Sequence, residues 1–219
     1  MTFPDYSVVF NNWPFLMRGL QVTLSVSAIA VVMGFFIGSA VGLLRLSRVK
    51  PLKIIAGAYV EFIRGTPLLV QLAILYFGLP SIGIDLSAFA AAVIGLSVNS
   101  GAYVGEIVRA GIQSVDKGQM EAARSLGMNG HMAMIFVILP QAFRRIIPPL
   151  VNEFIILIKD SSLLSTIAIT ELMRAGQHIR ARTYADFQIY TAIAVLYFIV
   201  TFTLSNVLGV LERRLQVSD

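Results

Sequence analysis

Long apolar runs separated by short polar segments dominate the pattern of this chain. A membrane-spanning helix needs about 20 mostly apolar residues. Five stretches meet that requirement, at about residues 15–46, 52–79, 86–113, 131–159 and 185–212. The pattern therefore predicts an all-α integral membrane protein with five transmembrane helices, in which residues 1–219 form a single transmembrane domain.

The polar segments between the spans differ in charge. Four Lys and Arg residues lie within residues 45–53, and basic loops mark the cytoplasmic side of a membrane. We therefore expect the N-terminus outside and the C-terminus, which follows Arg213 and Arg214, inside. Residues 161–183 are expected to form short extracytoplasmic helices, although their basic side chains run against the same rule.

Composition supports a membrane location and excludes several functions. The 219 residues are 57% hydrophobic and 13% charged, which is too apolar for a soluble domain. The net charge of +5 resides in short loops and does not indicate nucleic-acid binding. The chain has no Cys and two distant His residues, so we expect neither a disulfide nor a metal site. No catalytic group with an activating partner is visible, and no phosphate-binding loop occurs.

A short polar segment at residues 116–131 separates the third and fourth spans. Asp116 and Gln119 have the spacing of a capping box. Met120 to Leu126 can then form a short helix, and Gly127 can end it in the left-handed conformation. The segment predicts a compact helix–Gly–helix knob that protrudes from the membrane.

The same segment resembles the EAA motif of ABC-type importer permeases. The motif positions fall here at Glu121, Ala122, Ala123, Gly127, Leu139 and Pro140, with Val137 at the usual Ile position. Residues 64–71 (RGTPLLVQ) and 151–163 (VNEFIILIKDSSL) are similar to the polar amino acid permeases of this family, the histidine, arginine and glutamine group. The resemblance implies the type I importer fold, with the knob as a cytoplasmic coupling helix.

The resemblance also implies an assembly in the bacterial cytoplasmic (inner) membrane. Its members would be two permease chains, identical or paralogous, two copies of an ATP-binding subunit, and an extracytoplasmic substrate-binding protein. ATP and Mg²⁺ would be held by the ATP-binding partner, so we expect no cofactor in this chain. A passive channel or a membrane scaffold is the alternative from another class, because the chain carries no energy module of its own.

Polar residues inside the spans are the candidates for substrate contact. Asn99, Tyr103 and Glu106 form one stripe on the third span, where Glu106 is expected to pair with Arg109. In the second span the sequence Gly-Thr-Pro predicts a kink that frees backbone N–H groups. The pair Glu61 and Arg64, three residues apart just before the kink, is expected to form an ion pair.

The fourth span contains prolines that are expected to interrupt it and carries two acidic residues, Glu153 and Asp160, two turns apart on one face. Buried carboxylates are costly without a cation, which favours a basic amino acid as substrate. Alternatively Asp160 caps a helix at Ser161 and Glu153 pairs with Arg144 or Arg145, and the substrate is of the glutamine or glutamate type. The predicted substrate residues are Asn99, Glu153, Asp160, Thr66, Leu68 and Tyr103.

Overall fold

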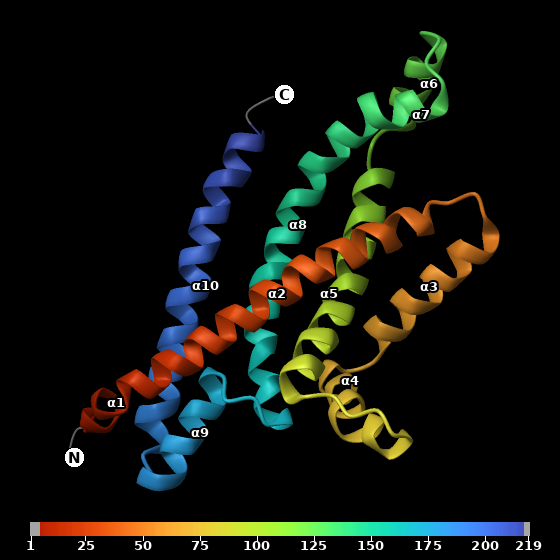
Figure 1. Ribbon diagram of the computed structural model, residues 1–219. Coiled ribbons are helices and arrows are strands. Elements are labelled where there is room, and N and C mark those ends of the chain that lie inside the picture. The colour runs from red at the N-terminus through yellow and green to blue at the C-terminus, as the bar shows by residue number, and fades with distance from the viewer. Residues whose placement is uncertain (1–4, 217–219) are drawn as a thin grey trace.

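All regular secondary structure is helical in residues 5–216, the part of the chain that the computed structural model describes (Figure 1). The all-α prediction is therefore confirmed. The elements in chain order are α1 (Ser7–Asn11), α2 (Trp13–Arg45), α3 (Lys50–Gly65), α4 (Leu68–Ala73), η1 (Ile74–Gly78), η2 (Leu79–Ile82), α5 (Ala88–Gln113), α6 (Lys117–Ser125), α7 (Gly130–Ala133), η3 (Met134–Ile138), α8 (Leu139–Asp160), η4 (Ser161–Ile167), α9 (Leu172–Thr183) and α10 (Asp186–Gln216).

Four helical stretches in the described residues are long and apolar enough to cross a membrane: Trp13–Arg45, Ala88–Gln113, Gly130–Ile167 and Asp186–Val207. A fifth crossing is possible where α3 and the elements from α4 to η2 follow each other with a bend of 102°. The kink predicted at Gly-Thr-Pro is thus a sharp break between two helices. The side chains of Arg213 and Arg214, the expected cytoplasmic end of the last span, lie outside the described residues.

Helices α2 and α5 form the most closely packed pair in the chain. One face of α2 carries Gly34, Gly38 and Gly42, which are buried against α5. Small residues allow two helix backbones to approach each other closely in a membrane. The pair forms a frame on which the other elements are arranged, with α3 on one side and α8 and α10 on the other (Figure 1).

Helix α8 does not break at Pro148 and Pro149, contrary to the sequence prediction. Proline's fixed φ is compatible with a helix, and the cost lies in the missing N–H and in crowding of the preceding turn. Arg144 and Arg145, which stand one turn before the two prolines, are exposed residues. The irregular backbone occurs earlier, in the π-helical segment η3, and Pro140 stands in the first turn of α8 after it.

The predicted short helices at residues 161–183 are η4 and α9. Helix α9 packs against α2 and α10, and a Cβ at Gly19 would lie 2.8 Å from Cβ of Ala175. In Figure 1 α9 and α1 lie at one end of the molecule, whereas α6 and α7 project beyond α5 and α8 at the other. The knob at α6 and α7 and the short helices at residues 161–183 therefore lie at opposite ends of the molecule (Figure 1).

Candidate functional site

The break between α3 and α4 is a closed turn held by side chains. Thr66 Oγ1 donates to the carbonyl of Phe62 at 3.0 Å, and Pro67 has no N–H to donate. Gln71, one turn into α4, reaches back. Its Nε2 donates to the carbonyl oxygens of Ile63 at 2.8 Å and Thr66 at 3.1 Å. These bonds pair carbonyls that the end of α3 would otherwise leave unpaired.

Asn99 is buried on α5 and faces this break. Its Nδ2 donates to Oε1 of Gln71 at 3.1 Å, so the structure links Asn99 to Thr66 through Gln71. Leu68 packs its side chain against the core beside α5. Sequence reasoning missed Gln71, although it is the single polar side chain in the apolar run from Leu68 to Leu75.

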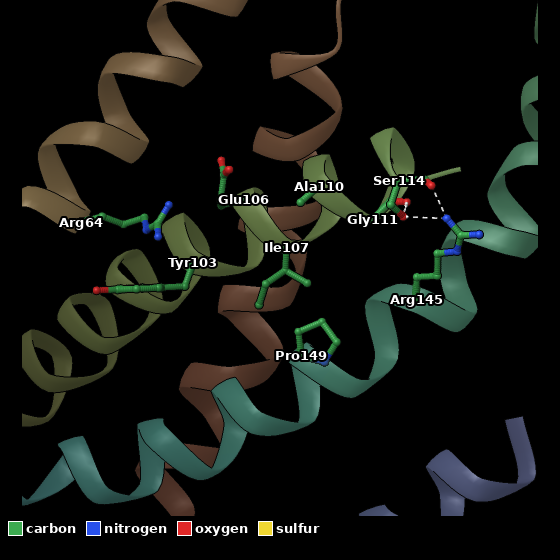
Figure 2. Close-up of a pocket in the computed structure, with 9 residues that line it drawn as sticks. All are labelled: Arg64, Tyr103, Glu106, Ile107, Ala110, Gly111, Ser114, Arg145 and Pro149. Carbon is green, nitrogen blue, oxygen red and sulfur yellow. Dashed lines mark hydrogen bonds between the residues drawn. The ribbon is translucent and has the colours of Figure 1, made fainter. Parts of the chain in front are cut away.

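A pocket of about 350 Å³ lies between α3, α5 and α8 (Figure 2). The guanidinium carbon of Arg64 lies 5.1 Å from the ring centroid of Tyr103, a cation–π contact. The predicted ion pair between Glu61 and Arg64 is wrong for the described residues, because the Arg64 side chain turns toward the aromatic ring on α5. The pocket is lined by Arg64, Tyr103, Glu106, Ile107, Ala110, Gly111, Ser114, Arg145 and Pro149.

Most charged groups around this pocket are already paired within the chain. Glu106 accepts a hydrogen bond from Nε of Arg109 at 3.1 Å and also forms an ion pair with Arg45 of α2. The predicted Glu106–Arg109 pair is therefore confirmed. On the opposite side, Arg145 Nη1 donates to Oγ of Ser114 at 3.3 Å and to the carbonyl oxygen of the same residue. These hydrogen bonds and ion pairs connect α5 to α2 and to α8.

Glu153 is buried on α8, with 8% of the residue exposed. It lines an apolar cavity of about 610 Å³ together with residues of α2, α5 and α10. Among the side chains that the structure describes, none forms a hydrogen bond or an ion pair with Glu153, and Arg145 binds Ser114 instead. The carboxylate therefore lacks the partner that a buried charge requires.

Asp160 lies at the last position of α8 and is half-buried. Its side chain does not cap η4, so the alternative of a cap at Ser161 is wrong. Asp160 and Arg64 are the charged groups whose electrostatic effect reaches Glu153. The predicted substrate residues do not line one cavity: Tyr103 faces the pocket of Figure 2, Glu153 faces the apolar cavity, and Asn99 faces the α3–α4 break.

The knob between α5 and α8 has the predicted form. Asp116 caps α6, but its carboxylate accepts from the N–H of Gly118 at 2.7 Å, and Gln119 donates its N–H to the Asp116 carbonyl oxygen at 3.1 Å. The expected capping box is therefore not formed. Gly127 has φ +88°, and the N–H of Met128 donates to the carbonyl of Ala123 at 3.2 Å. This is a Schellman C-cap.

The surface of the knob is suited to contact with another protein. Glu121 and Ala122 are exposed, Ala123 is buried, and Leu126 is 84% exposed. The second turn begins at Asn129, whose Oδ1 accepts from the N–H of Met132 at 2.9 Å. Two capped turns thus present a short polar helix and one large apolar side chain at the tip.

A buried carboxylate that sequence reasoning missed joins three helices at the opposite end. Glu171 is fully buried and caps α9, accepting from the N–H groups of Met173 at 2.7 Å and Arg174 at 2.8 Å. The Tyr197 hydroxyl of α10 donates to it at 3.1 Å, and the Thr23 hydroxyl of α2 lies at 3.5 Å. Burial raises the pKa of Glu171, against the lowering effect of these donors. Glu171, Tyr197 and Thr23 do not form a sequence motif, because they are distant from one another in the chain.

Comparison with known proteins identifies relatives along nearly the whole chain. The model of a family described as "Binding-protein-dependent transport system inner membrane component" matches residues 20–217. The L-cystine transport system permease protein of Bacillus subtilis (strain 168) is 46% identical over 204 residues, which cover 93% of this chain and 87% of the relative.

Two further relatives are named for other amino acids. The glutamine transport system permease protein of Escherichia coli (strain K12) is 40% identical over 215 residues, covering 97% of this chain and 98% of the relative. The arginine transport system permease protein of Bacillus subtilis (strain 168) is 38% identical over 216 residues, covering 98% and 99%. A crystal structure of an amino acid ABC transporter with histidines has a TM-score of 0.93 at 47% identity, over 98% of this chain and 100% of that one.

Proposed function

The chain belongs to the family of binding-protein-dependent transport system inner membrane components, and on that premise we propose that it is the transmembrane subunit of an ATP-driven amino acid importer. It performs no chemistry itself and forms the substrate path with a second permease chain. Two copies of an ATP-binding subunit hold ATP and Mg²⁺, and an extracytoplasmic binding protein delivers the amino acid. The lack of a phosphate-binding loop in the sequence agrees with this division.

The proposed orientation has the N-terminus outside and the C-terminus inside. The basic residues at 45–53 support it, because they follow α2 on a short loop. In this orientation α6 and α7 face the cytoplasm, where an ATP-binding subunit can reach them. Glu121, Ala122, Ala123 and Gly127 are the residues proposed to couple its closure to movement of α8, since the knob joins α8 directly through η3.

The proposed substrate is a basic L-amino acid such as arginine, lysine or histidine. The observation that carries this proposal is the buried Glu153 carboxylate, which has no partner of its own among the described residues. Asp160, two turns further along α8, adds a second negative charge. A cationic substrate side chain would offset the cost of burying both carboxylates.

The α-carboxylate of an amino acid substrate requires hydrogen-bond donors. Asn99 and the N–H groups at the start of α4 are the proposed donors, because no carbonyl of the preceding turn is available to these N–H groups. Thr66 and Leu68 belong to the same turn, and Tyr103 lies one helical turn from Asn99 on α5. These residues are proposed to contact the common part of every amino acid.

Glutamine is the second candidate substrate. Asn99 uses one N–H of its amide to bind Gln71, and its second N–H and its amide oxygen suit a neutral amide side chain. The 40% identical relative from Escherichia coli is named as a glutamine permease. Under this alternative Glu153 is protonated or is paired with the second permease chain.

The test is the substitution Glu153→Gln in the complete transporter, reconstituted in proteoliposomes with its binding protein. Loss of a buried charge partner typically costs 2–5 kcal/mol, so arginine uptake should fall by roughly thirtyfold or more relative to glutamine uptake. Glu61→Gln, at an exposed position of α3, is the control and should transport as wild type. Unchanged arginine transport with normal ATPase coupling in Glu153→Gln would refute the role of Glu153. Wild-type uptake of glutamine but not arginine would establish the second candidate.

A further inference from the structure

The amide of Gln71 has one possible orientation. Three oxygen atoms surround its Nε2: the carbonyls of Ile63 at 2.8 Å and Thr66 at 3.1 Å, and Thr66 Oγ1 at 2.9 Å. A carbonyl can only accept, so the NH₂ group must face these atoms. The amide oxygen then faces α5, where Nδ2 of Asn99 donates to it at 3.1 Å. Each polar atom of the Gln71 side chain is therefore engaged.

Without this side chain the turn between α3 and α4 would lose its internal support. The carbonyl of Ile63 belongs to the last turn of α3, where no following N–H completes the helical pattern. The carbonyl of Thr66 precedes Pro67, and the chain bends by 102° at this point. Unpaired carbonyls in an apolar environment are costly. A side chain at position 71 that cannot donate to these carbonyls would therefore favour opening of the turn.

The turn is fastened to α5 on both sides of the break. Asn99 holds the α4 side through Gln71, and the hydroxyl of Tyr59 on α3 donates to the carbonyl of Val98, the neighbour of Asn99. Helix α5 is in turn packed closely against α2. The exposed residues of the break, Gly65 and Pro67, are thus held beside the closely packed pair of α2 and α5.

We propose that Gln71 is a positioning residue of the transport site, which holds the α3–α4 turn against Asn99 so that the free backbone groups of the turn meet the substrate. The proposal rests on the transport function proposed above. Gln71 acts through Thr66 and Asn99 and need not touch the substrate. Removing its amide should therefore impair delivery of substrate through the membrane without affecting the ATPase itself.

A labelling experiment tests the geometry directly. The chain has no Cys, and Ile63, beside the break, is buried with 8% of the residue exposed, so Ile63→Cys gives a single reporter that is protected while the turn is closed. Loss of one buried hydrogen bond shifts a local opening equilibrium by about tenfold. Maleimide labelling of this cysteine in the assembled transporter should accelerate by about that factor in Gln71→Leu and Gln71→Glu. The control Gln21→Glu, at an exposed position of α2, should label as the parent.

A transport assay in proteoliposomes, with the same Gln71 variants in the cysteine-free chain, tests the function. Amino acid uptake per ATP hydrolysed should fall by about tenfold, while basal ATPase activity stays that of the parent and the melting temperature falls by only the roughly 3–6 °C that one lost hydrogen bond costs. Parental labelling rates, or parental uptake per ATP, in both variants would overturn the proposal. A melting temperature that falls below the temperature of the uptake assay would also overturn the proposal, because unfolding of the variant would then explain the lost uptake. If the wild type takes up none of arginine, glutamine or cystine, the transport function fails, and the labelling rates still decide whether Gln71 holds the turn.

Discussion

A single methyl group added at Gly42 should separate the two helices that frame the molecule. In the structure a Cβ at Gly42 would lie 2.8 Å from the carbonyl oxygen of Gly105 and 2.9 Å from Cβ of Val108. Both atoms are part of, or attached directly to, the α5 backbone, so a side-chain rotation cannot relieve the contact. Gly42→Ala therefore requires α2 and α5 to move apart.

The expected cost follows from two opposing effects. Forcing an extra carbon into a closely packed site costs about 1–3 kcal/mol, whereas replacing Gly by Ala within a helix gains about 1 kcal/mol. Gly57 of α3 provides a matched control, because a Cβ there meets nothing within 4 Å. Gly57→Ala has the gain without the contact, so the difference between the two variants isolates the packing cost of about 1–3 kcal/mol.

Thermal unfolding of the purified protein in mild detergent measures this difference. For a chain of 150–250 residues each 1 kcal/mol shifts the melting temperature by about 2–4 °C. Gly42→Ala should therefore melt about 2–12 °C below Gly57→Ala. Equal melting temperatures would refute the close approach of α2 and α5, and with it the inference that this pair forms a rigid frame.

Two further predictions concern the ends of the molecule. Gly127→Pro should abolish the left-handed turn, because proline cannot adopt φ +88°. The variant should remain folded but lose its ATP-binding partner in co-purification. The control Gly130→Pro, at the first position of α7, should retain that partner, because proline is tolerated at the start of a helix. Normal transport by Gly127→Pro would contradict the coupling role. Glu171→Ala removes a helix cap and a buried acceptor and should cost about 2–4 kcal/mol in thermal unfolding. Because burial raises the pKa of Glu171, its contribution declines as pH rises through that raised pKa, so the loss should be larger at acidic pH than at pH 8; a loss that grows with pH would contradict this.

Sequence reasoning succeeded where the signal was local. The left-handed Gly127, the Asp116 cap and the Glu106–Arg109 pair each depend on residues within a few positions of one another. The break at Thr66 was predicted where glycine and proline stand together, whereas Pro148 and Pro149 have no glycine beside them and α8 continues through them. The presence of four or five apolar helices followed from the length of the apolar runs, which the bilayer thickness constrains.

The interactions that sequence reasoning missed join distant parts of the chain. Glu171 binds Thr23 across 148 positions, and no periodicity relates the two. Gln71 and Asn99 are 28 positions apart, and their contact depends on the bend that precedes α4. The predicted partner of the Arg64 side chain was wrong for the same reason, since Tyr103 of α5 is a tertiary partner that competes with the local Glu61.

The distribution of irregular backbone indicates which elements face a path or a partner. Helices α2 and α5 are unbroken, whereas the bend of 102° and the π-helical segments η1 and η3 lie on the elements around them. Irregular backbone leaves polar groups that hydrocarbon cannot satisfy, and it is tolerated in a membrane only where protein or water covers it. We therefore expect the α3–α4 break and the start of α8 to be covered by protein or water, and the outer sides of α2 and α5 to face lipid. In the proposed transporter, movement of the knob at α6 and α7 would reach α8 through η3, while the close packing of α2 and α5 would keep Asn99 and the α3–α4 turn in place.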